Sequence, residues 1–233
     1  MKRIIFTFWL CCVVSIPLFS QGTLTIYYDK NWEEISNAKE AVYYRKAIAE
    51  SDNVWQVKDY YITDTLQMSG TYKSRKFNIR NGHFVYYFEN GLKDSEGNFV
   101  DDKRDGEWNF YHENGKKKSS GKFILDDKSG FWQYWDENGR LKSTENYSKP
   151  NNCTIEGFYP NGASSFKGTF QNNKPHGFWV YTNSKGRVTF SGNLKNGKKE
   201  GEWTRFYKEG SLKLIYKDGE TIRQKLGGMV RGE

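Results

Sequence analysis

Three histidines, Cys153 and two acidic pairs are the side chains of this sequence whose chemistry could serve catalysis or metal binding. The three histidines, His83, His112 and His176, have neither the i, i+4 spacing nor the short paired spacing of zinc ligands. We interpret each as a surface or turn residue. The glycines are separated by turn residues and no helix is expected after them, so they do not form a phosphate-binding loop. The Gly-x-Ser-x-Gly motif of a nucleophilic serine is also missing from the sequence.

Cys153 and the acidic pairs also have structural interpretations. Cys153 stands where a glycine of the repeat belongs and has no histidine close to it in sequence, so we interpret it as a structural thiol. Asp101-Asp102 and Asp126-Asp127 would suit calcium turns, because calcium takes about six to eight oxygen ligands. Later units carry Asn172-Asn173 and Lys195-Asn196 instead, which favours solvated hairpin turns. The sequence therefore predicts no enzyme, no metal site and no cofactor.

The N-terminal residues resemble an export signal. Lys2 and Arg3 precede an apolar stretch from Ile4 to Ile16, which is shorter than the roughly 20 residues of a membrane-spanning helix. Ser20 then provides a small residue for cleavage before Gln21. We expect residues 1–20 to be a signal peptide and the protein to be periplasmic, displayed on the outer surface or secreted. A retained N-terminal anchor is the alternative.

Charge and cysteine content limit the classes of partner and the source of stability. The net charge is +8, with 36 basic and 28 acidic side chains intermixed along the chain. No basic run or face resembles a nucleic-acid footprint, so we expect no nucleic-acid partner. A weak attraction to anionic lipid or polyanionic glycan stays open. Once the signal is removed, Cys153 alone cannot form an internal disulfide, so packing and β-ladders must stabilise the fold.

Glycine recurs every 24 residues and defines a repeat. The first glycine of each unit is Gly82, Gly106, Gly130, Gly177 or Gly201. Two residues later the units carry Phe84, Trp108, Trp132, Ile155, Trp179 and Trp203, and five residues later Tyr87, Tyr111, Trp135, Phe158, Thr182 and Phe206. Nine residues after the start comes a turn glycine: Gly91, Gly115, Gly139, Gly162, Gly186 and Gly210. A fixed period of this size indicates a repeat architecture.

Each unit is predicted to be a β-hairpin. Residues 107–111 and 131–135 are short, rich in aromatic side chains and without a helical period, which suits a half-buried strand. Asn-Gly pairs such as Asn114-Gly115 predict two-residue type I′ turns, which need positive φ at both central residues. The second link of each unit, such as residues 101–106, is predicted to be a longer polar turn that ends on glycine.

The resulting architecture is an all-β, elongated, single-layer antiparallel sheet of seven hairpin units and about 14 strands. The units start near residues 55, 82, 106, 130, 153, 177 and 201 and extend to residue 226. Residues 21–54 are predicted to cap the first edge of the sheet. Within them, residues 25–28 resemble a strand, and residues 38–50 are either a helix or part of a hairpin with residues 54–61. Residues 227–233 are predicted to be a flexible tail.

The repeat resembles a known family. Gly-x-Trp-x-x-aromatic-x-x-Asn-Gly, followed by Gly-x-Phe or Gly-x-Tyr and a polar link, is similar to the bacterial variant of the MORN repeat. The resemblance covers roughly residues 55–219. It implies an extended, curved β-sheet that contacts proteins or lipids and has no shared catalytic residues.

The aromatic rows are the candidate interaction or packing residues: Phe84, Trp108, Trp132, Trp179, Trp203, Tyr87, Tyr111, Trp135 and Phe206. They either hold the sheet together or also form a binding surface. The favoured function is a non-enzymatic exported scaffold that contacts an envelope or extracellular protein through an aromatic-lined sheet face. The alternative is a module that binds cell-envelope glycan or lipid headgroups.

Overall fold

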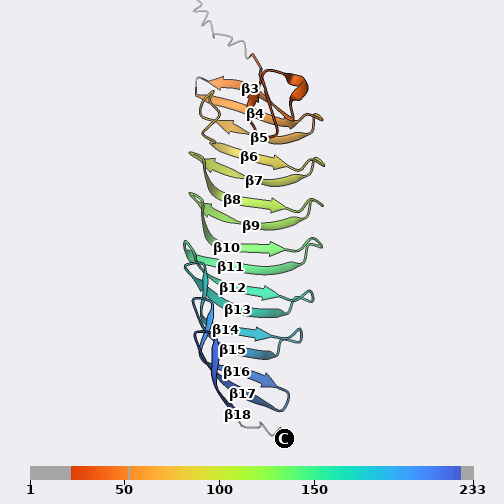
Figure 1. The fold of residues 1–233 in the computed structure, drawn as a ribbon. Helices are drawn as coiled ribbons and strands as arrows, with labels where there is room; N and C mark the ends of the chain where they lie inside the picture. Colours follow the sequence, from red (N-terminus) through yellow and green to blue (C-terminus); the bar gives the residue numbers. More distant parts are fainter. Residues whose placement is uncertain (1–21, 52, 227–233) are drawn as a thin grey trace, which may run out of the picture.

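A computed structural model describes residues 22–51 and 53–226 as one 18-stranded antiparallel sheet (Figure 1). The predicted signal peptide and the predicted tail lie outside the described residues. The strands are β1 (Leu24–Tyr28), β2 (Glu34–Ile35), β3 (Tyr43–Ser51), β4 (Val54–Tyr61), β5 (Leu66–Tyr72), β6 (Gly82–Tyr87), β7 (Lys93–Val100), β8 (Lys103–Tyr111), β9 (Lys117–Ile124), β10 (Asp127–Trp135), β11 (Leu141–Lys149), β12 (Asn152–Phe158), β13 (Ser164–Gln171), β14 (Lys174–Thr182), β15 (Val188–Lys195), β16 (Lys198–Tyr207), β17 (Gly210–Lys217) and β18 (Glu220–Leu226).

Consecutive strands pair along the sheet, so the molecule is a long stack of hairpins. Seven hairpins, from β4–β5 to β16–β17, correspond to the seven predicted units. The predicted fold class is confirmed. Four strands lie outside those hairpins: β1, β2 and β3 at one end and β18 at the other. In the described residues, no helix has the length and apolar character that crossing a membrane requires.

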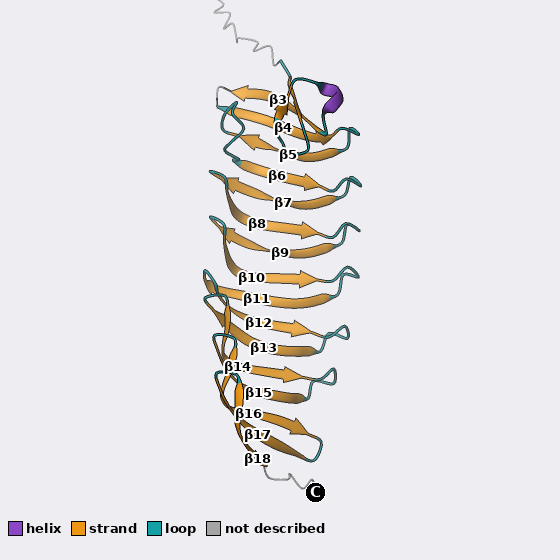
Figure 2. Ribbon diagram, in the orientation of Figure 1, coloured by secondary structure: helices purple, strands orange, loops and turns teal. Residues whose placement is uncertain are grey.

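The N-terminal segment is a hairpin and not a helix over residues 38–50. A single 3-10 turn, Ala38–Glu40, precedes β3, and β3 pairs with both β4 and β1 (Figure 2). Arg45 on β3 forms a buried two-pronged ion pair with Asp59 on β4, with nitrogen–oxygen distances of 2.7 and 2.8 Å. This ion pair joins the cap to the first unit, and burying it requires both partners, because one alone would be an uncompensated charge.

The Asn-Gly loops are not type I′ turns, which corrects the prediction. In the loop after β6, Gly91 N–H donates to the Phe88 carbonyl and Phe88 N–H donates to the Leu92 carbonyl. Gly91 has φ of +81°, whereas Asn90 does not have positive φ. This geometry is a type I turn closed by a left-handed glycine. The Asn90 side chain accepts a bond of 2.9 Å from Leu92 N–H, which explains the asparagine.

Turns with positive φ at both central residues lie at the opposite ends of the hairpins. Asp101 and Asp102 have φ of +49° and +68°, and the same pattern recurs at Leu125-Asp126, Asn172-Asn173, Asn196-Gly197 and Asp218-Gly219. The sequence predicted a longer link here. The link is short because the polar residues after the turn already pair with the preceding strand, as Arg104 does with Phe99.

The first glycine of a unit lies in a bulge that bends its strand. Glu96 pairs with Asn109 and Asn98 pairs with Asp105, so three residues of β8 lie opposite Gly97 alone. Gly106 belongs to this stretch and has φ of +82°, which an L-residue rarely adopts. The pairings of β9 with β10, β13 with β14 and β15 with β16 contain a comparable register shift. The strands curl at the end opposite the Asn-Gly loops (Figure 2).

The bend places an aromatic ring over a glycine of the preceding strand. Trp108 lies over Gly97 and Trp132 over Gly121, so closely that a Cβ at either glycine would be 2.3 Å from the indole ring. Each of these indole Nε1 groups donates a 3.1 Å bond to a backbone carbonyl of that preceding strand. We call the face of the sheet that carries these tryptophans the core face, and the other the outward face.

Candidate functional site

The structure places the first aromatic row in the core. Relative exposures are 0% for Phe84, 2% for Trp108, 1% for Trp132, 5% for Trp179 and 0% for Trp203. Neighbouring rings meet edge to face, as Phe99 does with Trp108 and Phe123 with Trp132. This row is therefore not available as a stacking surface for a ligand.

The second aromatic row lies on the outward face. Tyr111 donates a 2.5 Å bond from its hydroxyl to Glu96, which pairs with Asn109 on that face. Burial and this bond raise the pKa of Tyr111 to about 12. The equivalent residues Tyr87 and Trp135 are half-buried, and Phe206 is exposed. This row is the part of the predicted aromatic set that reaches solvent.

The predicted turn glycines fall into two groups. Left-handed φ is found at Gly91, Gly115, Gly139, Gly162 and Gly186. Gly210 does not have positive φ and is the first residue of β17, where it pairs with Tyr207. The connection there is a two-residue turn, so the prediction of Gly210 as a turn glycine is wrong.

The candidate metal ligands are scattered. His83 is exposed on β6, His112 Nε2 lies 3.0 Å from the Trp135 carbonyl oxygen, and His176 is on β14. Across residues 22–51 and 53–226, no three histidine, cysteine or acidic side chains gather closely enough to hold a metal ion.

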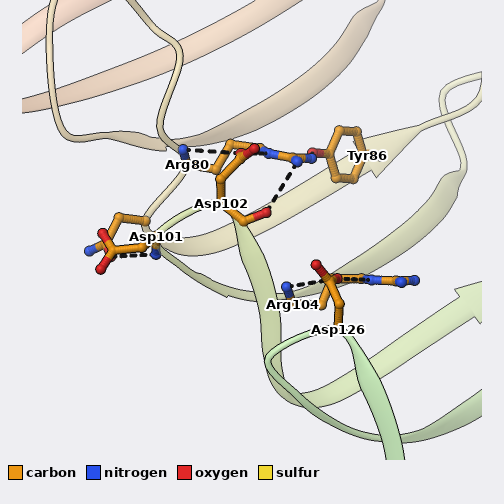
Figure 3. Close-up of polar contacts among 7 residues, drawn as sticks. Arg80, Tyr86, Asp101, Asp102, Arg104 and Asp126 are labelled. Carbon is orange, nitrogen blue, oxygen red and sulfur yellow. Dashed lines mark hydrogen bonds and ion pairs between the residues drawn. The ribbon is translucent and has the colours of Figure 1, made fainter.

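The aspartates of the turns hold a row of basic side chains. Asp102 pairs with Arg80 at 2.5 Å and Asp126 pairs with Arg104 at 2.8 Å (Figure 3). The bond from Arg80 holds the pKa of the Asp102 carboxyl below its ordinary value. At Asp126, burial opposes the shift but the bonds from Arg104 still lower the pKa. Leu125-Asp126 stands 24 residues after Asp101-Asp102 and forms the equivalent turn. Asp126-Asp127 is therefore offset by one residue and does not repeat the acidic pair Asp101-Asp102.

These basic side chains also cover the core aromatics. The guanidinium carbon of Arg80 lies 4.0 Å from the Phe99 ring centroid, and that of Arg104 lies 3.9 Å from the Phe123 centroid. Lys128 and Lys199 hold the same repeat position and also lie over aromatic rings. A basic residue two positions before the repeat glycine is the sequence signal that would have revealed this row. The units are numbered 1 to 7 in chain order, and units 5 and 6, which start at residues 153 and 177, carry Asn151 and Pro175 at that position.

The boundary between units 4 and 5 interrupts the repeat at the bend. Unit 5 starts 23 residues after unit 4, with Cys153 in place of glycine. Strands β11 and β12 pair without a register shift from the pair Ser143–Gly157 to the pair Tyr147–Cys153. Cys153 does not have positive φ. Without a glycine able to take left-handed φ, β12 lacks the three-residue bulge, and the register shift at this boundary instead lies on β11, between Tyr147 and Lys149.

The core is also interrupted there. Glu145 occupies the position of Gly97 and Gly121, and its pairing partner is Ile155 at a tryptophan position. Glu145 accepts bonds from the hydroxyls of Tyr134 (2.5 Å) and Tyr147 (3.0 Å) and lies 3.4 Å from Lys128 Nζ. The buried hydrophobic residues accordingly form two clusters: one runs from Ala47 to Trp132, the other from Trp179 to Tyr216.

The stack of Asn-Gly loops is the third feature that changes at this boundary. Elsewhere the loop asparagine donates to a carbonyl of the next loop, as Asn90 does to Glu113 (2.9 Å), Asn114 to Glu137 (2.8 Å) and Asn161 to Ser184 (2.8 Å). Within the described residues, Asn138 of unit 4 makes no such bond to unit 5. The loop of unit 4 instead bonds to itself through Asp136, which accepts from Asn138 N–H and from Arg140.

Hollows open on the surface where the repeat is interrupted. One of about 390 Å³ lies at the loop end and is lined by His112, Trp135, Asp136, Glu137, Arg140, Leu141, Lys142, Phe158 and Pro160. A second of about 510 Å³ lies on the outward face over β10 to β14. The candidate site is therefore the boundary of units 4 and 5, where the chain departs from its own repeat.

Comparison with protein families agrees with the hairpin frame. A model described as the MORN repeat variant matches residues 104–124, 130–149 and 199–218. These segments coincide with units 3, 4 and 7. Among curated proteins, the search returned no match. The three matches fall on hairpins of one common frame, so these segments are similar to the MORN repeat variant and support a MORN-type repeat scaffold.

Proposed function

We propose that the protein is a non-enzymatic, exported repeat scaffold that binds a partner protein at the loop end of the boundary between units 4 and 5. The observation that carries this proposal is the hollow bounded by Trp135, Arg140 and Phe158. It is the place where members of the outward aromatic row border a concave surface instead of lying along a continuous sheet.

The side chains of this hollow match those of protein interfaces. Aromatic residues and arginine are enriched at such interfaces, and binding energy concentrates in a few of them within pockets. Trp135 and Phe158 supply the aromatic walls, and Asp136, Glu137 and Lys142 supply charged groups of both signs at the rim. Rim charges of both signs favour a partner with a patterned charged surface over a purely anionic polymer.

The side-chain bonds that join neighbouring units at the loop end are also interrupted at this boundary. His112 lies in hydrogen-bond contact with the Trp135 carbonyl, and the Tyr159 hydroxyl donates to the Thr182 carbonyl at 2.7 Å. Unit 4 has Asp136 at the repeat position of His112 and Tyr159, and a carboxylate cannot donate to the next carbonyl. Within the described residues, the Phe158 carbonyl thus receives no side-chain bond from unit 4.

Binding of glycan or lipid through the tryptophan row is not part of the proposal, because that row is buried. Export rests on the sequence of residues 1–20. N-terminal sequencing of the protein recovered outside the cytoplasm tests this part. We expect the sequence to start at or near Gln21, and a product that begins at Met1 would contradict cleavage.

Photo-crosslinking tests the binding proposal. Lys142→Cys carries a benzophenone maleimide at the rim of the hollow, and Lys208→Cys carries it in the last hairpin loop as the matched control. Burial raises the pKa of the Cys153 thiol, so Cys153 reacts slowly, and labelled wild-type protein measures this background.

Each labelled protein is irradiated in a cell-envelope fraction of the source organism. We expect a protease-sensitive adduct of discrete mass from position 142 and none from position 208. Equal labelling from both positions, or an adduct that resists protease, would contradict a protein partner at this site.

A further inference from the structure

The outward face carries a groove that the loop-end hollow does not include. It has a volume of about 510 Å³ and crosses five neighbouring strands, from β10 to β14. Phe131 on β10 and Phe178 on β14 line it at either side. At about 4.8 Å between neighbouring strands, these two residues are roughly 19 Å apart along the sheet. The groove is therefore long in the direction of the sheet axis, which runs down Figure 1.

Phe131 and Phe178 are exposed on the outward face and belong to neither buried cluster. Their relative exposures are 56% and 57%. Both occupy the position directly after the first residue of a unit, where other units carry His83, Glu107 and Glu202. Single exposed aromatic residues are common on proteins. Phe131 in unit 4 and Phe178 in unit 6 share one repeat position and flank unit 5, which lacks the bulge, so they form a matched pair.

The floor between the two rings is polar and compact. Phe131 pairs with Asn146, Asn146 with Thr154 and Thr154 with Thr169, so these four side chains form one row across four strands. Asn146 and Thr154 are exposed. The row is continuous because β11 and β12 pair without a register shift from Ser143 to Tyr147, and β12 and β13 do so from Cys153 to Gly157.

The groove has little net charge. Glu156 and Lys167, the charged residues that line it, lie 3.0 Å apart and neutralise each other. An anionic polymer or a phosphate headgroup gains nothing from such a floor. Hydroxyl and amide groups bordered by aromatic rings instead match a ligand that has apolar C–H faces and many neutral hydroxyls.

We propose that this groove binds a neutral oligosaccharide chain that lies along the sheet axis. Sugar rings stack on Phe131 and Phe178, and their hydroxyl groups bond to Asn146 and Thr154 between the two phenyl rings. The Thr169 hydroxyl donates to the His176 carbonyl, so it serves the sugar as an acceptor. The site is separate from the loop-end hollow that binds the proposed protein partner, so either proposal stands without the other.

Isothermal titration of the mature protein with cellohexaose, chitohexaose and maltohexaose tests this proposal. We expect at least one of these neutral hexasaccharides to bind. Phe131→Ala and Phe178→Ala should each lower its affinity by about tenfold or more, the usual effect of removing an anchoring aromatic contact. Thr154→Val, which keeps the shape and removes the hydroxyl, should also weaken binding. Melting temperatures should stay at the wild-type value, because these side chains are exposed.

Tyr207→Ala is the matched control, because Tyr207 is also 56% exposed but lies on β16, outside the groove. It should bind the hexasaccharide like the wild type. The proposal is overturned if none of the three sugars binds, or if the phenylalanine variants bind as well as Tyr207→Ala. Loss of an envelope protein from Phe131→Ala without any sugar binding would assign the groove to a protein instead. Crosslinking from position 142 reports on the loop-end site in either case.

Discussion

The contact between a tryptophan and a glycine is the residue-scale unit of this fold. A ring can lie on the preceding strand only where that strand has no side chain, and a Cβ at Gly97 or Gly121 would overlap the indole of Trp108 or Trp132. The glycine that recurs within a strand therefore has a packing reason, and the glycine of the loop has a conformational one. Both appear in the sequence with the same period, which is why spacing alone does not separate their roles.

Trp132→Ala tests the packing role of the first aromatic row. Trp132 is 1% exposed, and its truncation should lower the free energy of unfolding by about 3–5 kcal/mol in urea. The neighbouring Phe131→Ala removes an exposed ring and should change it by less than about 0.5 kcal/mol. A Trp132→Ala protein as stable as the wild type would contradict the structural role.

Gly115→Val tests the conformational role of the loop glycines. Gly115 has φ of +79°, so a β-branched side chain there should destabilise the hairpin by about 1–3 kcal/mol. Glu113→Ala in the same loop should have almost no effect, because the Glu113 group that bonds to Asn90 is its backbone carbonyl. Equal shifts in melting temperature for the two variants would show that left-handed φ is not required at position 115.

Turn chemistry marks what the sequence could and could not predict at this scale. Asn-Gly correctly located the loops, because a left-handed glycine is needed in either turn type. It did not reveal the type, because asparagine acts here through its side chain and not through its own φ. The turns with two positive φ values use pairs such as Asp101-Asp102 and Leu125-Asp126. Leucine is uncommon at such a position, so local propensity did not predict that turn.

At the scale of elements, the boundary between β11 and β12 divides the repeat array. Cys153, Glu145 and Ile155 replace residues that elsewhere make the bend and the ring-on-glycine contact. The sequence showed the irregular spacing and the missing glycine. It could not show that the buried clusters would separate, because that depends on which ring rests on which strand.

Because the two buried clusters are separate, the losses in unfolding free energy caused by one mutation in each cluster should add. Trp132 belongs to the first cluster and Trp203 to the second. The double variant Trp132→Ala/Trp203→Ala should lose the sum of the two single losses within about 0.5 kcal/mol, as expected for sites without shared partners. Trp203→Ala alone should cost as much as Trp132→Ala, since β17 and β18 follow Trp203 and leave it 0% exposed. Coupling well above about 0.5 kcal/mol between the two sites would show that the array has one continuous core.

At the scale of the whole molecule, the sheet contains strands at both ends that the seven hairpin units do not supply. Seven hairpin units were predictable because period, aromatic position and turn glycine agree along most of the chain. The strands at the two ends were harder to assign. β18 lacks the repeat glycine and tryptophan, and the Arg45–Asp59 ion pair that joins the cap to unit 1 links residues with no periodic signal.

In the molecule as a whole, the core face provides stability, and the outward, loop-end side of the boundary between units 4 and 5 is the proposed binding surface. Trp135→Ala removes an aromatic wall of the loop-end hollow, and Phe206→Ala removes the ring at the same repeat position three units away. Both variants truncate a ring of the outward aromatic row, half-buried at Trp135 and exposed at Phe206, and only Trp135 lines the hollow.

Co-sedimentation with purified cell envelopes tests this account most directly. The wild-type protein and Phe206→Ala should sediment to the same extent, whereas Trp135→Ala should lose most of its binding, about tenfold or more in affinity. Urea midpoints near the wild-type value would show that the proteins compared are folded. Undiminished sedimentation of Trp135→Ala, or a stable Trp132→Ala protein that no longer sediments, would contradict the account.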